Sequence, residues 1–184
     1  MKKAALLLID TISDFDFPGG DRLRAALISN APNIERLQAS FRRWDMPVIY
    51  VNDNYGRWRD DFQTQMRRIA AASPAGKELV GKFKPDLHDY FILKPHRSAF
   101  FKTPLDHLLG TLGVERLVLA GQTTDMCIAA TAIDAKMREF EIFIPNDCCV
   151  AIKRSHHEEA LRFLRRTCDA MCISSTELTE RFSV

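Results

Sequence analysis

A cysteine at the predicted start of a helix is the side chain of this sequence best suited to nucleophilic chemistry. Cys127 ends the segment Leu117–Cys127, in which a strand-like apolar run passes through the turn Gly-Gln-Thr-Thr into a helical pattern. Thr124 is predicted to be the N-cap, so Cys127 would lie about three residues into the helix. Free backbone N–H groups and the helix dipole favour a thiolate there, which predicts a Cys127 pKa below the ordinary value of about 8.5. The same N–H groups could stabilise an oxyanion during acyl transfer.

Two charged residues at predicted strand ends could supply the rest of an acyl-transfer site. Asp10 follows the apolar run Ala4–Ile9, and its carboxylate could take the thiol proton and return it to a leaving amine. Lys94 could favour the thiolate and anchor the carboxylate through its positive charge. Each residue also has a plain structural interpretation, since free cysteines are usually small buried side chains and an Asp–Lys pair can be a simple ion pair.

The elements that would position these residues follow from an alternation of short apolar runs and longer amphipathic ones. Six runs are predicted to be strands: Ala4–Ile9, Val48–Asn52, Tyr90–Leu93, Arg116–Ala120, Glu141–Pro145 and Ala170–Ile173. Helices are predicted at Asp21–Trp44, Pro104–Leu112, Thr124–Phe140, Ser155–Thr167 and Ser175–Arg181. Pro32 is expected to break the first helix or to mark its N-terminal turn.

This order of elements predicts one α/β domain over residues 1–184, with a doubly wound, about six-stranded parallel sheet flanked by helices in a Rossmann-like arrangement. Most of the strands are continuously apolar, as expected when helices cover both faces of a sheet. Ligands bind at the carboxyl ends of the strands in such a fold. Asp10, Lys94 and the turn before Cys127 all follow predicted strands, so we expect them to converge on one edge of the sheet.

Composition excludes several other classes of protein. The 26 basic and 24 acidic residues are interspersed and give a net charge of +2, so no basic face for nucleic acid is predicted. The opening apolar run is too short for a membrane span or a signal peptide, and the first strand lacks the glycine-rich turn of a nucleotide-binding module. Five cysteines without zinc-ribbon spacing fit a reducing compartment. We therefore expect a cytoplasmic protein that acts on a small molecule and binds neither nucleic acid nor membrane.

Three separated motifs resemble the isochorismatase-like cysteine hydrolase family over nearly the whole chain. They are Leu6–Asp10 followed by Asp14 and Phe15, Lys94-Pro95 followed by Ser98-Ala99-Phe100, and Gly121–Cys127. The resemblance implies the isochorismatase-like hydrolase fold and a catalytic triad of Asp10, Lys94 and Cys127. It also implies a cis peptide bond between Gln122 and Thr123, an oxyanion hole formed by the N–H groups of Thr123 and Cys127, and a homo-oligomer, either a dimer or a tetramer.

The sequence departs from two branches of that family. Nicotinamidase-type members carry an Asp-x-His motif and a second histidine after the second strand, whereas Asn52–Arg59 contains no histidine, so we predict no metal and no other cofactor. Isochorismatases proper generally lack the cysteine and cleave a vinyl ether. We therefore predict a hydrolase that cleaves the C–N bond of a small amide or ureide through a thioester on Cys127. A vinyl ether hydrolase of the isochorismatase type and a catalytically silent interaction domain of the same fold are the alternatives.

The segment after the second predicted strand is expected to line the substrate pocket, because binding residues concentrate on such loops. Asn54, Tyr55, Arg57 and Trp58 are its candidate substrate-binding residues, together with Phe15 beyond the first strand. Arg57 or Arg59 could bind a carboxylate through a forked pair of hydrogen bonds, and Trp58 could stack on a planar substrate.

Two other groups of residues are interpreted as structural. Arg57 and its neighbour Arg59 could form ion pairs with the nearby aspartates Asp14, Asp60 and Asp61 instead of binding a substrate. His156 and His157 lie beside acidic residues at a predicted helix start, and we interpret them as part of a solvated helix face.

Overall fold

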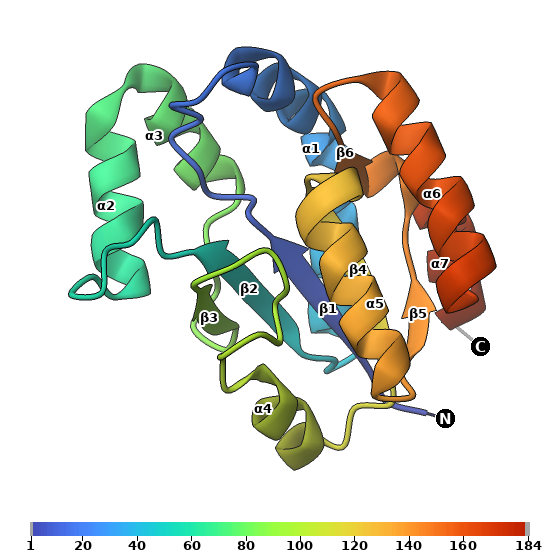
Figure 1. Cartoon of the computed structure of the whole chain (residues 1–184). Coiled ribbons are helices and arrows are strands. Elements are labelled where there is room, and N and C mark those ends of the chain that lie inside the picture. Colours follow the sequence, from blue (N-terminus) through green and yellow to red (C-terminus); the bar gives the residue numbers. More distant parts are fainter. Residues whose placement is uncertain (1, 183–184) are drawn as a thin grey trace.

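Strand β1 (Ala4–Ile9) is buried along its whole length because helices cover both faces of the sheet to which it belongs (Figure 1). The computed structural model describes residues 2–182. Within this range the other strands are β2 (Val48–Asp53), β3 (Tyr90–Lys94), β4 (Arg116–Gln122), β5 (Glu141–Phe143) and β6 (Cys149–Val150). All pair in parallel, in the order β3-β2-β1-β4-β5, with β6 also paired to β4. The predicted doubly wound parallel sheet is confirmed.

Helices and short helical turns connect these strands. The α-helices are α1 (Gly20–Arg43), α2 (Phe62–Ala72), α3 (Pro74–Lys82), α4 (Leu105–Leu112), α5 (Ala129–Met137), α6 (Arg154–Cys168) and α7 (Ser175–Phe182). A π-helical turn, η1 (Thr124–Ile128), precedes α5, and a 3-10 turn, η2 (Asn146–Cys148), precedes β6. Within residues 2–182, none of the helices combines the length and the apolar composition that a membrane crossing requires.

Alternate side chains of the central strand point into two separate apolar cores. Leu6 and Leu8 pack with α1, α2, α3 and α7 on one face of the sheet. Leu7 and Ile9 pack with α4, α5 and α6 on the other face. Figure 1 shows α4 and α5 in front of the sheet and α1 behind it. Because both faces are covered, the carboxyl end of β1 is poorly hydrated, and Asp10 directly after it is only 7% exposed.

One predicted strand is wrong. The segment Ala170–Ile173 forms a single β-bridge, between Met171 and Phe143, and β6 is the sixth strand in its place. The carbonyl of Cys172 accepts a hydrogen bond from the Arg165 guanidinium at 2.8 Å, so it is not available to a neighbouring strand. The carbonyls of Met171 and Ile173 accept the N–H groups of Ile144 and Asn146, both at 2.9 Å, so the segment lies along the edge of the sheet without forming a regular strand.

The first helix runs through its proline without a break. Pro32 lies inside α1, so the break or N-terminal turn predicted at this residue is wrong. A proline removes one helical hydrogen bond and costs about 3 kcal/mol or more. Pro32 lies on the exposed side of the helix, where water can reach the freed carbonyl, whereas Leu27, Ala31 and Ile34 are buried on the opposite side. Burial of that apolar face outweighs the lost hydrogen bond.

Two helices between β2 and β3 fall outside the predicted elements. Each begins at a side-chain cap: the Asp61 carboxylate accepts the Thr64 N–H at 2.6 Å, and the Ser73 hydroxyl accepts the Gly76 N–H at 3.0 Å. Asp61 and Ser73 are residue types that favour N-caps, so the sequence contains a signal for both helix starts. Few apolar residues of α2 and α3 are buried, however, so the apolar periodicity that would predict a helix after each cap is weak.

The order of the strands reverses around β1, and that point positions the site. In open α/β sheets, ligands bind outside the carboxyl ends of the strands where the order reverses. Gly121, near the end of β4, has a φ of +115°, and a Cβ on it would lie 2.1 Å from the Ile9 carbonyl oxygen. Glycine at this position therefore allows β4 to approach β1 closely just before the turn that carries Cys127.

Candidate active site

Three side chains from separate strand ends meet at the carboxyl edge of the sheet. The Lys94 Nζ lies 2.9 Å from a carboxylate oxygen of Asp10 and 3.5 Å from the Cys127 Sγ. Lys94 is fully buried, Asp10 is almost so, and Cys127 is half-buried. The structure therefore brings together the three residues that the sequence predicts to carry the chemistry.

Asp10 is held by contacts from the ends of three other strands. It follows β1 with a φ of +51°, a conformation that aspartate tolerates better than most residues. One carboxylate oxygen accepts the Asp53 N–H at 2.7 Å, and the other faces Lys94. The Asp10 carbonyl accepts the side-chain amide of Gln122 at 2.6 Å. These contacts fix the direction of the carboxylate before any substrate arrives.

Lys94 reaches the other two residues across the end of an intervening strand. β2 separates β3 from β1, which places the two strands roughly 10 Å apart at the usual spacing. The long lysine side chain spans this gap. Its Nζ also donates to the His96 carbonyl at 3.2 Å and lies 3.8 Å from the Asp53 carboxylate. A buried ammonium is thus compensated by several oxygen acceptors as well as by the thiol.

Cys127 lies in a compact turn that follows β4. The peptide bond between Gln122 and Thr123 is cis. The Thr123 carbonyl then accepts the N–H groups of Met126, at 3.2 Å, and of Ile128, at 3.1 Å. Met126 and Ile128 flank Cys127 in the sequence, and the Cys127 N–H does not donate to the Thr123 carbonyl.

The predicted N-cap is wrong, and two histidines that the sequence did not connect with the site lie against this turn. Thr123, not Thr124, occupies the cap position, and Thr124 begins η1. The Thr124 hydroxyl instead lies 2.8 Å from the Nδ1 of His157 on α6, and His156 lies 3.5 Å from the Asp125 carboxylate. The interpretation of this histidine pair as a solvated face holds only in part, because both residues are half-exposed and each also contacts the turn. No local pattern reveals these contacts, because about 30 residues separate the partners.

The predicted lowering of the Cys127 pKa is also wrong. Burial and the nearby Asp10 carboxylate raise the pKa of the Cys127 thiol to about 12, against the opposing charge of Lys94. Burial raises the pKa of Asp10 above its ordinary value, although the Lys94 ammonium counteracts the shift. Burial by itself would lower the pKa of Lys94, but its interactions with Asp10, Cys127 and Asp53 together outweigh burial, and the pKa is raised. One ammonium cannot compensate two anions in a dry site, so the resting site holds a thiol, a carboxylate and an ammonium.

Three of the predicted substrate-binding residues are hydrogen-bonded or buried in the segments beside Asp10. The Tyr55 N–H donates to the Asp53 carboxylate at 2.7 Å, and the Tyr55 hydroxyl donates to the Ser13 Oγ at 2.9 Å. Asn54 is buried at 7% exposure. Phe15 is 6% exposed and packs in the core on the α1 side of the sheet. Tyr55 and Asn54 thus form a wall beside the carboxylate, while Phe15 mainly supports it from the core.

The remaining two candidates lie at the exposed tip of the same loop. Arg57 is exposed, and Trp58 is 78% exposed. Among the described residues, no acidic side chain pairs with Arg57 or Arg59, so the ion-pair interpretation is wrong. Asp14 pairs instead with Arg68, at 3.0 Å. The guanidinium of Arg57 is therefore free to meet a ligand if the tip folds over the site.

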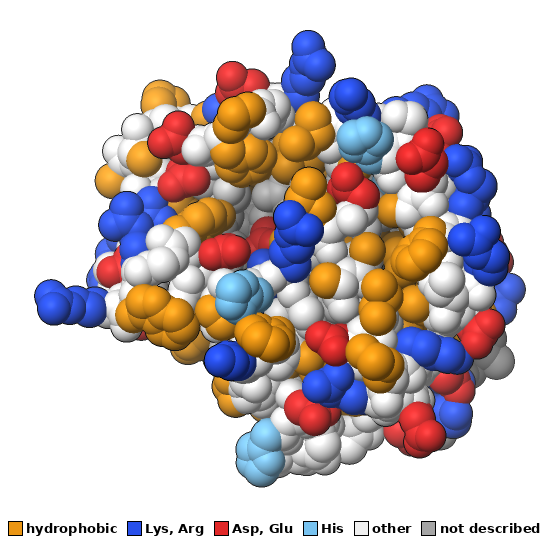
Figure 2. Space-filling model, in the orientation of Figure 1, with side chains coloured by type: hydrophobic (Ala, Val, Ile, Leu, Met, Phe, Trp, Pro, Cys, Tyr) orange, Lys and Arg blue, Asp and Glu red, His pale blue; other side chains and the backbone are white. Residues whose placement is uncertain are grey.

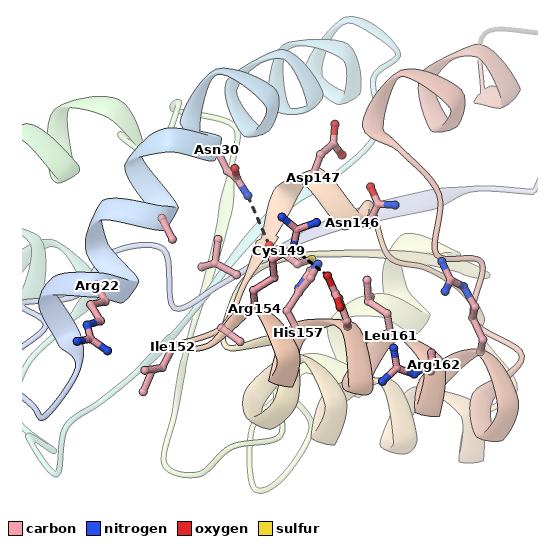
Figure 3. A pocket seen from close by; sticks show the side chains of 15 residues that line it. Arg22, Asn30, Asn146, Asp147, Cys149, Ile152, Arg154, His157, Leu161 and Arg162 are labelled. Atoms are coloured by element: carbon pink, nitrogen blue, oxygen red, sulfur yellow. Dashed lines mark hydrogen bonds and ion pairs between the residues drawn. The ribbon is translucent and has the colours of Figure 1, made fainter.

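The surface is hollowed above this edge of the sheet, and a second groove lies elsewhere. Figure 2 shows the hollow over the carboxyl ends of the central strands. The second groove, of about 830 Å³, runs between α1 and α6 and has Arg22, His157 and Arg162 on its walls (Figure 3). No residue of the triad lines this groove. The His157 ring therefore stands between the groove and the turn that holds Cys127.

No group of three or more His, Cys, Asp and Glu side chains within residues 2–182 is placed to hold a metal ion. Asp53 lies near the Lys94 ammonium, and Asp61 caps α2. Both carboxylates already have partners that a metal would have to replace.

The fold and this site define a doubly wound α/β enzyme whose polar groups gather at the carboxyl edge of the sheet. The family model for the isochorismatase domain matches residues 4–177. The chain belongs to the isochorismatase family and is a hydrolase of that family.

Several relatives are similar to this chain over most of its length. YaaI of Bacillus subtilis, an uncharacterized isochorismatase family protein, is 33% identical over 98% of this chain and 100% of its own length. A probable isochorismatase of Pseudomonas chlororaphis is 28% identical over 96% of this chain and 85% of the relative. The crystal structure of N-carbamoylsarcosine amidase from Thermoplasma acidophilum is 25% identical, with a TM-score of 0.70 over 94% of this chain and 96% of that one.

Proposed function

We propose that this protein hydrolyses the C–N bond of a small amide or ureide with Cys127 as nucleophile. The observation that carries the proposal is the position of the Lys94 ammonium, within 2.9 Å of Asp10 and 3.5 Å of Cys127 in a buried site. If the Lys94–Asp10 ion pair served only to stabilise the fold, there would be no reason for the half-buried Cys127 thiol to lie beside it. The similarity to N-carbamoylsarcosine amidase supports the choice of a C–N bond.

In the first half-reaction the Cys127 thiol attacks the carbonyl carbon of the substrate while Asp10 takes its proton. The S–C bond forms, and the carbonyl oxygen becomes an oxyanion. The negative charge moves from Asp10, which becomes neutral, to the oxyanion, while the bonded sulfur is neutral and Lys94 keeps its proton. Asp10 then gives the proton to the nitrogen, the C–N bond breaks, and ammonia or an amine leaves a thioester on Cys127.

In the second half-reaction a water molecule attacks the thioester, with Asp10 as the base that accepts its proton. The C–S bond breaks, the acid is released, and the proton returns from Asp10 to the sulfur. The N–H groups of Thr123 and Cys127 would stabilise both oxyanions, at about 3 to 4 kcal/mol for each donor. Asn54 and Tyr55 would bound the site, and Arg57 and Trp58 would contact the far end of the substrate.

Vinyl ether cleavage of the isochorismatase type is the second candidate, and the similarity to the probable isochorismatase favours it. That reaction needs an acid to protonate the substrate, and burial, which raises the pKa of Asp10, would help this carboxyl to act as one. It does not need the thiol. Replacement of Cys127 therefore separates the two functions, because only amide hydrolysis is lost.

The experiment is a panel of small primary amides and ureides, with and without a carboxylate, assayed for released ammonia. The wild type should release ammonia from at least one member of the panel, and Cys127→Ala should not. A matched control is Cys172→Ala, because Cys172 is a buried free thiol whose Sγ donates to the backbone carbonyls of Leu161 and Ala170. A Cys127→Ala variant that keeps wild-type turnover would refute the nucleophile.

We also propose that the protein works in the cytoplasm as a homo-oligomer. All five cysteines are free, which fits a reducing compartment. The outer faces of η1, α5 and α6 expose Met126, Ile133, Met137 and Phe163, apolar side chains that a second copy could cover. Sedimentation equilibrium should give a dimer or tetramer, and a monomer at tens of micromolar protein would contradict this part of the proposal.

A further inference from the structure

The turn that holds Cys127 is tied to helix α6 by a hydrogen bond outside the triad. The Thr124 Oγ1 and the His157 Nδ1 are 2.8 Å apart. Thr124 is fully buried, and it is the first residue of η1, the π-helical turn that contains Cys127. His157 is thus connected to the nucleophile through three residues of backbone, although it touches no member of the triad.

His157 belongs to a helix that packs against the core. α6 is anchored in the apolar core by Leu161 and Leu164. At its first turn, two consecutive residues meet two consecutive residues of η1, because the neighbouring His156 lies 3.5 Å from Asp125. Burial lowers the pKa of His157, so its ring is neutral at neutral pH and can accept the Thr124 hydroxyl at Nδ1 with its proton on Nε2.

We propose that His157 is a positioning residue: through Thr124 it fixes the π-helical turn and thereby the position of the Cys127 sulfur relative to Lys94 and Asp10. A π turn is rarely stable without outside contacts and is often found at functional sites. Loss of the bond leaves a buried hydroxyl without its partner, and the turn relaxes towards ordinary helical geometry. A change of about 1 Å in the position of a reacting atom can reduce turnover by up to about 100-fold.

This inference rests on the proposed function, because it assigns a role that matters only if Cys127 is the nucleophile. Two variants remove the bond from opposite ends. His157→Leu keeps the bulk of the ring, and Thr124→Val keeps the shape of the threonine. His157→Asn is the conservative variant, because its amide places a polar atom where Nδ1 lies. His107→Leu, on the exposed side of α4, is the matched control for a histidine-to-leucine change.

Two readouts distinguish positioning from a purely structural role. The first is the rate at which iodoacetamide alkylates Cys127, measured by mass spectrometry of the Cys127 peptide, which needs no knowledge of the substrate. The second is kcat and KM on a substrate found in the amide panel. We expect both His157→Leu and Thr124→Val to reduce kcat by about tenfold with KM changed by less than about twofold, and to change the alkylation rate by a similar factor. The double variant should lose no more than either single one, because both remove the same contact.

The positioning role is supported if kcat of His157→Asn is within about threefold of the wild-type value and kcat of His107→Leu equals the wild-type value. The inference is overturned if both bond-removing variants keep wild-type kcat and alkylation, or if kcat falls only in proportion to the folded fraction seen by circular dichroism. If His157→Leu does not fold, Thr124→Val carries the same test from the other end of the bond. Failure of the proposed function looks different, because Cys127→Ala would then remain active whatever the His157 variants do.

Discussion

Replacing Asp10 with Asn removes a proton acceptor while preserving the shape of the side chain. The Asn oxygen can still accept the Asp53 N–H, which Asp10 accepts at 2.7 Å, but the amide that replaces the second oxygen cannot pair with the Lys94 ammonium. Without a base, turnover should fall by about 100-fold or more. The loss should appear in kcat, since no contact with the far end of the substrate is changed.

The same substitution should make Cys127 more acidic, which is the less obvious half of the prediction. The Asp10 carboxylate is one of the two causes that raise the pKa of the Cys127 thiol to about 12, and Lys94 opposes them. In Asp10→Asn the like charge closest to the sulfur is gone, and Lys94 keeps as anionic partners the sulfur and the Asp53 carboxylate at 3.8 Å. A charge at this separation shifts a pKa by about one to three units, so the pKa of Cys127 should fall by that amount.

The assay follows both quantities in one preparation. The pH dependence of Cys127 alkylation reports the thiol pKa, and ammonia release from a panel substrate reports turnover. Asp10→Asn should therefore alkylate faster than wild type near pH 8 while it turns over far more slowly. Asp16→Asn, at an exposed position in the same segment, is the matched control and should change neither. Near-normal turnover in Asp10→Asn would show that Asp10 is not the base, and a Cys127 pKa that stays or rises would show that its carboxylate does not raise the thiol pKa.

Three further predictions concern pH, packing and metal. Asp10 must be ionised to act as a base, and burial raises its pKa, so kcat/KM should decrease as the pH is lowered. The decrease should begin at a pH above the ordinary carboxyl pKa of 3.8. A kcat/KM that stays constant down to roughly pH 4 would contradict this prediction. Gly121→Ala should lower the melting temperature by several degrees, because its Cβ would lie 2.1 Å from the Ile9 oxygen, whereas Gly81→Ala, with nothing within 4 Å of its Cβ, should not. Prolonged chelation followed by assay in metal-free buffer should leave amide hydrolysis unchanged, and activity that returns only with an added divalent ion would refute a metal-independent mechanism.

The sequence predicts the sheet well because apolar runs buried on both faces leave a clear signal. Asp10 and Lys94 could be placed at one edge because each ends or follows such a run, and parallel strands bring their carboxyl ends together. The uninterrupted helix around Pro32 could not be predicted, since tertiary burial of the opposite face decides it. The segment Ala170–Ile173 does lie beside β5, but only Met171 forms a bridge, and the apolar pattern carries no sign of this irregular edge.

The chemistry of the site was harder to predict than its composition. Helix-start arguments treat Cys127 in isolation and give a low pKa, whereas the fold buries the thiol beside a carboxylate and reverses the direction of the shift. The contact between His157 and Thr124 joins elements that the chain order separates, and a histidine among acidic residues carries no local sign of such a role. The Cys127 pKa and the His157–Thr124 contact both depend on how closely separate elements approach one another. Those distances are set only by the packing of the whole fold.

The central claim is that Cys127 becomes acylated during turnover. The direct measurement is intact-protein and peptide mass spectrometry of enzyme that is quenched with acid during steady-state turnover of a panel substrate. A mass increase equal to the acyl part of that substrate, on the peptide that contains Cys127 and removable by hydroxylamine, is the predicted result. Ammonia release that continues undiminished in Cys127→Ala, with no adduct on the Cys127 peptide of the wild type, would contradict the account.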